Sequence, residues 1–169
     1  MPPSMEQAYV ANGFEPVIYE GVLVHSFVPI NVSTGDTIRV AWQSTRSPLV
    51  QGLALRLRRP GVTGSKGYAG RLRIGDSVSP GKALWMDTAP AIVDIHCDAV
   101  PADTRLEISN RWRAPNGRED EWLNNYGIRV EELGPDSWIL HCSDGVGDRP
   151  TFDDLVVRID IIRSNASAD

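Results

Sequence analysis

The stretch "LALRLRR" (residues 53–59) decides the fold class of this chain. Apolar and charged residues alternate along it, so that three leucines face one way while Arg56 and Arg58 face the other. Successive side chains of a β-strand point to opposite faces. The alternation therefore predicts a strand with one face buried in a core and the other in contact with solvent.

The same period of two recurs along the whole chain, between turns rich in Gly, Pro, Asn and Asp. It predicts nine or ten short strands, at 22–28, 36–44, 53–59, 71–75, 91–97, 104–112, 126–133, 137–142 and 155–162. No segment of eleven or more residues has a helical stripe, although 117–125 could form one or two helical turns. We expect an all-β fold, a single antiparallel β-sandwich of jelly-roll type that spans residues 1–169 as one domain.

Length and composition are those of an ordinary globular protein with its own core. The chain has 169 residues, of which 41% are hydrophobic and 23% charged. No apolar run approaches the roughly 20 residues that span a bilayer, and the N-terminal residues do not have the pattern of a secretory signal. These observations predict no membrane span and leave open whether the protein is cytoplasmic or exported by a non-standard route.

Charge is distributed unevenly between the two halves of the chain. Residues 1–85 contain nine Lys or Arg and five Asp or Glu, whereas residues 86–169 contain eight and seventeen. This layout argues against a general nucleic-acid binder and is compatible with a homo-oligomer that associates head to tail.

A crowded acidic loop precedes the last predicted strand. It contains Asp144, Asp148, Asp153 and Asp154 around a glycine-bent turn. Calcium takes about six to eight oxygen ligands, and a divalent cation would relieve the repulsion among four close carboxylates. The loop therefore predicts a Ca²⁺ site, with a solvated hairpin loop as the alternative.

Two known motifs resemble this loop. The segment "DGVGD" is similar to the core of thrombospondin type 3 calcium repeats, with Cys142 in place of their first Asp. Residues 144–159 resemble the closing motif D-x-x-x-F-N-D-V-V-V of an uncharacterised β-sandwich domain in bacterial repeat-in-toxin adhesins and surface proteins. The residues that match are Asp148, Phe152, Asp154, Val156 and Val157, while Thr151 and Asp153 depart from the motif. The resemblance implies calcium binding by the acidic residues, in a module for adhesion.

Two His-Cys steps end predicted strands, at His96–Cys97 and His141–Cys142. If these strands pair, Cys97 faces Cys142 and a disulfide forms in an oxidising compartment. Two buried thiols are the alternative, and a zinc site is a third, although neighbouring residues of a strand cannot easily share one ion.

A basic hairpin is the first candidate for a ligand or partner surface. If 53–59 pairs with 70–74, then Arg56, Arg58, Arg71 and Arg73 share one outward face. Such a face could bind phosphates, anionic glycans or the acidic half of another copy. The alternative is a solvated edge whose charges prevent aggregation.

Trp112 and Trp122 flank a polar loop and are the second candidate. An exposed tryptophan ring there could stack on a sugar or a partner, while packing in the core or at its rim is the alternative.

The sequence gives no support for catalysis. No nucleophile lies beside a base in a known pattern, and a G-x-S-x-G elbow is absent. We therefore predict a non-enzymatic calcium-binding module for recognition or adhesion, with carbohydrate among its candidate ligands. The alternative is a coat, tail or filament subunit that self-associates through oppositely charged surfaces.

Overall fold

The computed structural model describes residues 4–164. Its larger sheet has seven antiparallel strands. In spatial order they are β12 (Gly127–Gly134), β13 (Ser137–Ser143), β14 (Leu155–Ile162), β4 (Thr37–Thr45), β9 (Ile92–Ala99), β6 (Arg71–Ile74) and β7 (Ser77–Ser79).

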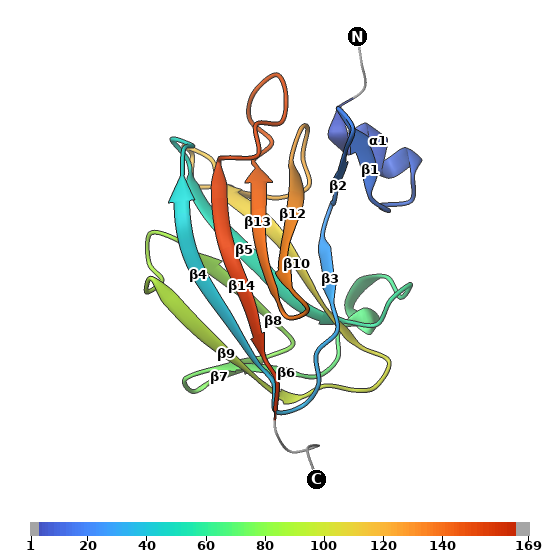
Figure 1. Ribbon diagram of the computed structural model, residues 1–169, viewed down its shortest axis with the longest axis vertical. Coiled ribbons are helices and arrows are strands. Elements are labelled where there is room, and N and C mark those ends of the chain that lie inside the picture. The colour runs from blue at the N-terminus through green and yellow to red at the C-terminus, as the bar shows by residue number, and fades with distance from the viewer. Residues whose placement is uncertain (1–3, 165–169) are drawn as a thin grey trace.

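The second sheet has five strands and packs behind the first. Its members are β11 (Glu119–Asp120), β10 (Arg105–Arg113), β5 (Val50–Arg58) and β8 (Gly81–Trp85), with β3 (Val28–Ile30) also paired to β10. In Figure 1, β4, β14, β13 and β12 lie in front of β5 and β10. Two layers of antiparallel strands confirm the predicted all-β sandwich, although the described residues form 14 strands rather than the nine or ten predicted.

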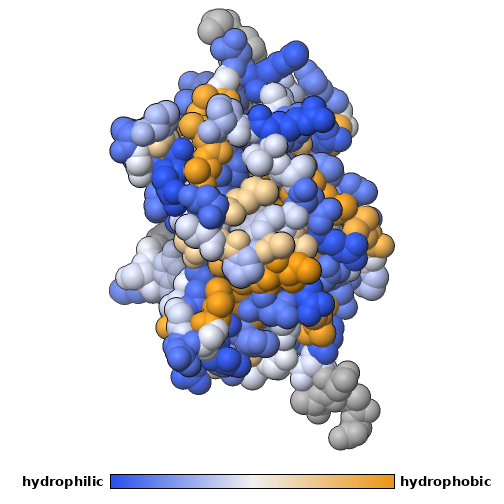
Figure 2. All heavy atoms as spheres, turned by 90° about the vertical axis from the view of Figure 1, so that its left-hand side faces the viewer, coloured by the Kyte–Doolittle hydropathy of each residue, from blue (hydrophilic) through white to orange (hydrophobic). Residues whose placement is uncertain are grey.

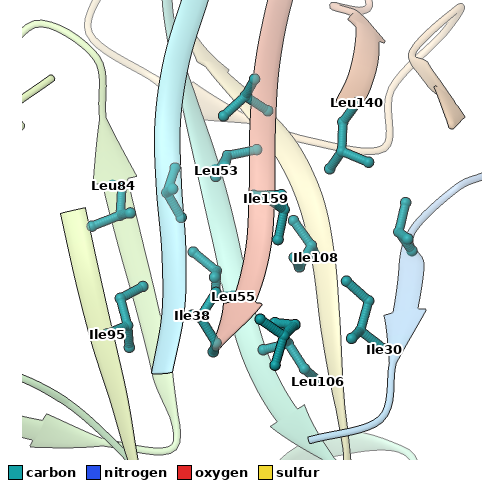
Figure 3. Packing of buried hydrophobic residues seen from close by; sticks show 14 of the residues in the cluster. Ile30, Ile38, Leu53, Leu55, Leu84, Ile95, Leu106, Ile108, Leu140 and Ile159 are labelled. Carbon is teal, nitrogen blue, oxygen red and sulfur yellow. The ribbon is translucent and has the colours of Figure 1, made fainter. Parts of the chain in front are cut away.

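The core lies between the sheets, where the predicted alternation places the apolar residues. Leu53, Leu55 and Leu57 of β5 are fully buried in one cluster with residues of the other sheet. Figure 3 shows Leu53 and Leu55 beside Ile38 and Ile159 of that sheet. Burying one such side chain contributes roughly 1.5–3 kcal/mol. The remaining inward residues of β14, namely Leu155, Val157 and Ile161, are buried in the same cluster.

A smaller core holds the N-terminal elements against one end of the sandwich. Helix α1 (Met5–Ala11) begins at a capping box made by Ser4 and Gln7, and it buries Met5 and Tyr9. The hairpin of β1 (Val17–Tyr19) and β2 (Val22–Val24) follows it. The cluster comprises Met5, Tyr9, Val24, Trp112, Tyr126 and Phe152.

Several local predictions were wrong because the elements are short. The expected strand at 22–28 divides into β2 and β3, which belong to different sheets. Residues 117–125 contain β11 and turns rather than helical turns, and the seven-residue α1 was not predicted. Elements of two to seven residues are too short to show a clear hydrophobic period.

The predicted basic hairpin does not form. Strand β5 pairs with β10 and β8, whereas β6 pairs with β9 and β7 in the opposite sheet. Between them the chain crosses the sandwich through a loop that contains the 3₁₀ helix η1 (Gly64–Gly67). Arg71 and Arg73 therefore lie on the other sheet from Arg56 and Arg58.

The predicted contact between Cys97 and Cys142 is also wrong. Strands β14 and β4 separate β13 from β9, so both cysteines are free thiols buried in the core. Burial raises the pKa of Cys97 to about 12 and raises that of Cys142 further still. The alternative of two buried thiols is confirmed. In residues 4–164 no helix has the length and apolar character needed to cross a bilayer.

Candidate functional site

A groove of about 580 Å³ lies on the outer face of the five-stranded sheet. Its floor is made by outward residues of β5 and β10, which alternate with the buried leucines and isoleucines of the same strands. Loops from four other parts of the chain form its walls. The lining residues are Gly13, Phe14, Glu15, Phe27, Arg56, Arg58, Arg59, Gly61, Val62, Thr63, Gly64, Tyr68, Arg105, Glu107 and Trp122.

Three arginines of the groove lie against aromatic rings. The guanidinium carbons of Arg56, Arg58 and Arg105 lie 5.1, 4.5 and 5.6 Å from the ring centres of Trp122, Tyr68 and Phe27, respectively. On the same sheet, Arg111 and Arg113 of β10 lie 5.5 and 4.6 Å from the ring of Trp85. Such contacts occur roughly once per 70–80 residues in proteins. The five contacts on this one sheet therefore exceed the number expected for a whole chain of 169 residues. We call the lined depression the arginine–aromatic groove.

Ion pairs hold the arginine side chains of the floor in place. Both terminal nitrogens of Arg56 donate to Glu121, and Arg56 also donates to the hydroxyl of Ser109 at 3.1 Å. Burial alone would lower the pKa of Arg56, but the pairing with Glu121 outweighs it and leaves the pKa raised. Arg56 is thus charged and fixed at any physiological pH.

Glu107 lies between two further arginines of the groove. Its Oε2 accepts a hydrogen bond from Nε of Arg105 at 3.1 Å, and its Oε1 lies 3.8 Å from Nε of Arg58. A carboxylate between two guanidinium groups offers an acceptor beside several donors. The floor can therefore both donate hydrogen bonds to a ligand and accept them from it.

Two aromatic residues of the groove have a strained backbone. Phe14 and Trp122 adopt φ values of 64° and 59°, a left-handed conformation that is uncommon for large side chains. Such strain costs on the order of 1–3 kcal/mol per residue and gathers at functional sites. The indole N–H of Trp122 donates to the carbonyl oxygen of Ser26 at 3.0 Å, which fixes the ring while 36% of the residue remains exposed.

The structure brings together only part of the predicted ligand surface. Arg56, Arg58 and Trp122 line one groove, as their joint role requires. Arg73 instead pairs with Asp98 on the other sheet, at 2.8 Å, and Arg71 is exposed there. Trp112 is only 2% exposed and belongs to the smaller core, so it cannot stack on a ligand.

Sequence reasoning missed most of the groove, because only Arg56, Arg58 and Trp122 of its lining were among the predicted surface residues. Arg105 and Glu107 are outward residues of the predicted strand at 104–112. The alternation that places the apolar residues of this strand in the core also places these two on its outer face. Phe14 and Tyr68 lie in segments with no regular pattern, and Phe27 lies in the predicted strand at 22–28, which does not form as one strand. Only their arrangement in space reveals that they meet the arginines.

The acidic loop forms a second polar cluster, away from the groove. Asp144 is 3% exposed, and its Oδ2 accepts hydrogen bonds from Ser47 Oγ at 2.6 Å and from Gln51 Nε2 at 3.1 Å. Its Oδ1 accepts one from the backbone N–H of Val146 at 3.1 Å. Donors of the protein thus satisfy both oxygens of this buried carboxylate.

Asp154 is the one aspartate of the loop that contacts Asp144. Its Oδ2 accepts a hydrogen bond from the backbone N–H of Asp144 at 2.9 Å and one from Thr151 Oγ1 at 3.2 Å. Burial, together with the charge of Asp144, raises the pKa of Asp154 to about 6. Ionisation of Asp154 is therefore less favourable in the folded protein than in the unfolded chain.

The four aspartates do not gather into one group. Asp148 is exposed and Asp153 half-buried. Within residues 4–164, no three or more His, Cys, Asp or Glu side chains are placed to hold a metal ion together. Calcium binding stays a prediction for this loop, in which the Asp154 carboxylate contacts the backbone N–H of Asp144.

Comparison with protein families, with curated proteins and with solved structures found no match for this chain. Its function must therefore be argued from the groove and the loop themselves.

Proposed function

We propose that this protein is a non-enzymatic recognition module that binds a carbohydrate in the arginine–aromatic groove. The observation that carries the proposal is the convergence of aromatic rings with fixed donors and acceptors in one groove of about 580 Å³. Ligand pockets of this size combine apolar surface with a few polar groups that orient the ligand. A sugar presents both kinds of surface, because its ring carries C–H faces and hydroxyl groups.

The balance of charge in the groove favours a sugar over a polyanion. Its four arginines are matched by Glu15 and Glu107 in the lining and by Glu121 and Asp103, which pair with Arg56 and Arg59. A polyanion would gain little attraction from guanidinium groups that carboxylates already neutralise. Hydroxyl groups both donate and accept hydrogen bonds, so they suit a floor where arginine and glutamate alternate.

The lining residues also favour binding over catalysis. Among the described residues that line the groove there is no His, Cys or Ser. The arginines and the indole N–H of Trp122 are engaged in contacts that fix them rather than activate them. Groups held rigidly in this way lower the entropy cost of binding a ligand.

Calorimetric titration with a panel of oligosaccharides tests the proposal. We expect at least one oligosaccharide to bind, and Trp122→Ala to weaken that binding tenfold or more because a stacking surface is lost. Leu133→Ala is the matched control, since Leu133 is 44% exposed on β12 and lies outside the groove. If no oligosaccharide binds, or if Trp122→Ala binds as well as the wild type, the proposal is wrong.

None of the residues that line the groove belongs to the acidic loop, so we treat calcium binding as a separate proposal. Calcium binding by Asp144 and Asp154 would act separately, by tying the loop to the start of β14. A titration of metal-free protein with millimolar calcium, followed by heat and by melting temperature, tests it.

A self-associating assembly subunit is the alternative function. The uneven charge of the chain suggested it, but the arginines of the groove are paired within the protein rather than left for a second copy. Figure 2 shows one side of the molecule, on which the apolar patches are small and separated by polar residues. Large apolar patches are the usual mark of stable association. A concentration-dependent sedimentation coefficient would favour the alternative.

A further inference from the structure

We propose that the ligand of the groove carries a carboxylate, as a uronic or sialic acid does, and that Arg105 binds it. This inference rests on the proposed carbohydrate-binding function and specifies the class of sugar. It follows from the hydrogen bonds that each arginine of the groove already makes.

Arg56, Arg58 and Arg59 use terminal nitrogens for contacts within the protein. Both terminal nitrogens of Arg56 are bound to Glu121, and Nη2 of Arg58 donates to the carbonyl oxygen of Val62 at 2.7 Å. Arg59 donates from Nε to Asp103 at 2.8 Å and from Nη1 to the carbonyl oxygen of Lys66 at 3.5 Å. These three side chains shape the groove and have few donors left for a ligand.

Arg105 differs from them, because its outer edge has no partner in the part of the chain that the structure describes. Its Nε donates to Glu107, while neither Nη1 nor Nη2 meets an acceptor in residues 4–164. The side chain is 30% exposed, so the two terminal nitrogens are accessible from the groove. A planar guanidinium with two free terminal nitrogens matches a carboxylate in bidentate geometry.

Two contacts hold the guanidinium of Arg105 in position before any ligand arrives. Glu107 binds its Nε at 3.1 Å, and the ring of Phe27 lies 5.6 Å from its central carbon. A guanidinium already fixed in this way loses little entropy when it binds a ligand. Arg105 is thus prepared to receive a charged group.

The position of Glu107 indicates which group of the ligand should lie next to the ligand's carboxylate. Its Oε1 accepts no hydrogen bond within the described residues and lies in the groove, 3.8 Å from Nε of Arg58. A hydroxyl group on the same sugar can donate to this oxygen while the carboxylate binds Arg105. The charge of Glu107 and Glu15 also disfavours a ligand with several negative groups. A sugar with one carboxylate and neighbouring hydroxyls meets both conditions.

Matched pairs of sugars test this inference by calorimetry. The probes are xylotriose that bears one glucuronic acid, its carboxyl-reduced form, sialyllactose, lactose, and lactose that bears one sulfate. We expect an acidic sugar to bind at least tenfold more tightly than its neutral counterpart. We expect Arg105→Gln to remove that difference and Arg105→Lys to retain part of it. Arg73→Gln is the matched control, because Arg73 also donates from Nε to one carboxylate, that of Asp98, but lies on the other sheet.

The outcomes separate this inference from the proposed function. Equal binding of acidic and neutral sugars would overturn the role of Arg105 while leaving carbohydrate binding intact. A preference that survives in Arg105→Gln, or tighter binding of the sulfated sugar than of the carboxylated sugars, would overturn it as well. If none of the five probes binds but another oligosaccharide of the panel does, the role of Arg105 is overturned and carbohydrate binding stands. If no oligosaccharide of the panel binds, both are overturned. Circular dichroism of each variant establishes that it is folded.

Discussion

The guanidinium carbon of Arg56 lies 5.1 Å from the centre of the Trp122 ring, although the two residues come from distant parts of the chain. The contact depends on Glu121, which pairs with Arg56 and precedes Trp122 directly. The loop after β11 is thereby fixed over the outer face of β5. This relationship closes one wall of the groove and links the sheet to its ligand-contacting ring.

The core face of β5 should dominate stability. We expect Leu53→Ala to lower the free energy of unfolding by about 2–5 kcal/mol, because Leu53 is fully buried between the sheets. Ile92→Ala is the control and should change it by less than about 0.5 kcal/mol, since Ile92 is 58% exposed. Urea unfolding measures both. Equal effects of the two changes would mean that the sheets do not pack as described.

The raised pKa of Asp154 predicts that stability depends on pH. A carboxyl whose pKa is about 6 when folded and near 3.8 when unfolded binds its proton more tightly in the folded state. Its ionisation therefore lowers stability as the pH rises from about 4 to 6, and the penalty is complete above that. Asp154→Asn should be more stable than the wild type by about 1 kcal/mol at pH 8.

The same difference should disappear near pH 4, where Asp154 is protonated in the wild type. Urea unfolding of both proteins at pH 8 and pH 4 measures it, with Asp148→Asn as the control because Asp148 is exposed. If Asp154→Asn is less stable than the wild type at pH 8, the hydrogen bonds of the ionised carboxylate stabilise the fold by more than its burial destabilises it.

Asp144 should stabilise the fold without any metal ion. Its side chain accepts hydrogen bonds from Ser47, Gln51 and the backbone of Val146, all of which lose their partner in Asp144→Ala. Hydrogen bonds to a charged group contribute about 1.5–3 kcal/mol each. In EDTA we expect the variant to lose about 2–4 kcal/mol. A loss that occurs only when calcium is present would instead identify Asp144 as a ligand of the ion.

The two cysteines should behave as inaccessible thiols. Both are buried, and burial raises the pKa of Cys97 to about 12, so little reactive thiolate forms at neutral pH. We expect a disulfide reagent such as Ellman's reagent to react slowly with the native protein and to detect two thiols after unfolding in denaturant without reductant. Detection of none in the unfolded protein would mean that a disulfide joins them.

The sequence predicts the faces of strands better than the pairing between them. Alternation places Leu53 inward and Arg56 outward correctly, because burial on one face of a sheet is a local requirement. Strand β5 pairs with β8 and with β10, which both lie well beyond it along the chain, so no local pattern reveals the pairing. The same limit explains why Cys97 and Cys142, which occur in strands of similar sequence, lie on strands that two others separate.

The candidate site was predictable where it followed the same alternation. Arg56 and Arg58 are outward residues of one strand and share the groove, whereas Arg71 and Arg73 depended on a pairing that does not exist. Trp112 and Trp122 flank the same loop, yet only one is exposed. Trp112 lies on the inner face of β10 opposite Gln51, and Trp122 lies in a loop with a left-handed backbone. Trp112 is in phase with Leu106 and Ile108 of the predicted strand at 104–112, so the alternation already favoured its burial, whereas Trp122 follows no regular pattern.

The most direct test of carbohydrate binding in the groove is an NMR spectrum of the five tryptophan indole N–H groups during titration with the oligosaccharide panel. Trp122 lines the groove, whereas Trp112 is buried in the smaller core. We predict that at least one oligosaccharide shifts the Trp122 signal in a saturable manner and leaves the Trp112 signal in place. The proposal is contradicted if no oligosaccharide moves the Trp122 signal, or if the tryptophans that respond all lie outside the groove.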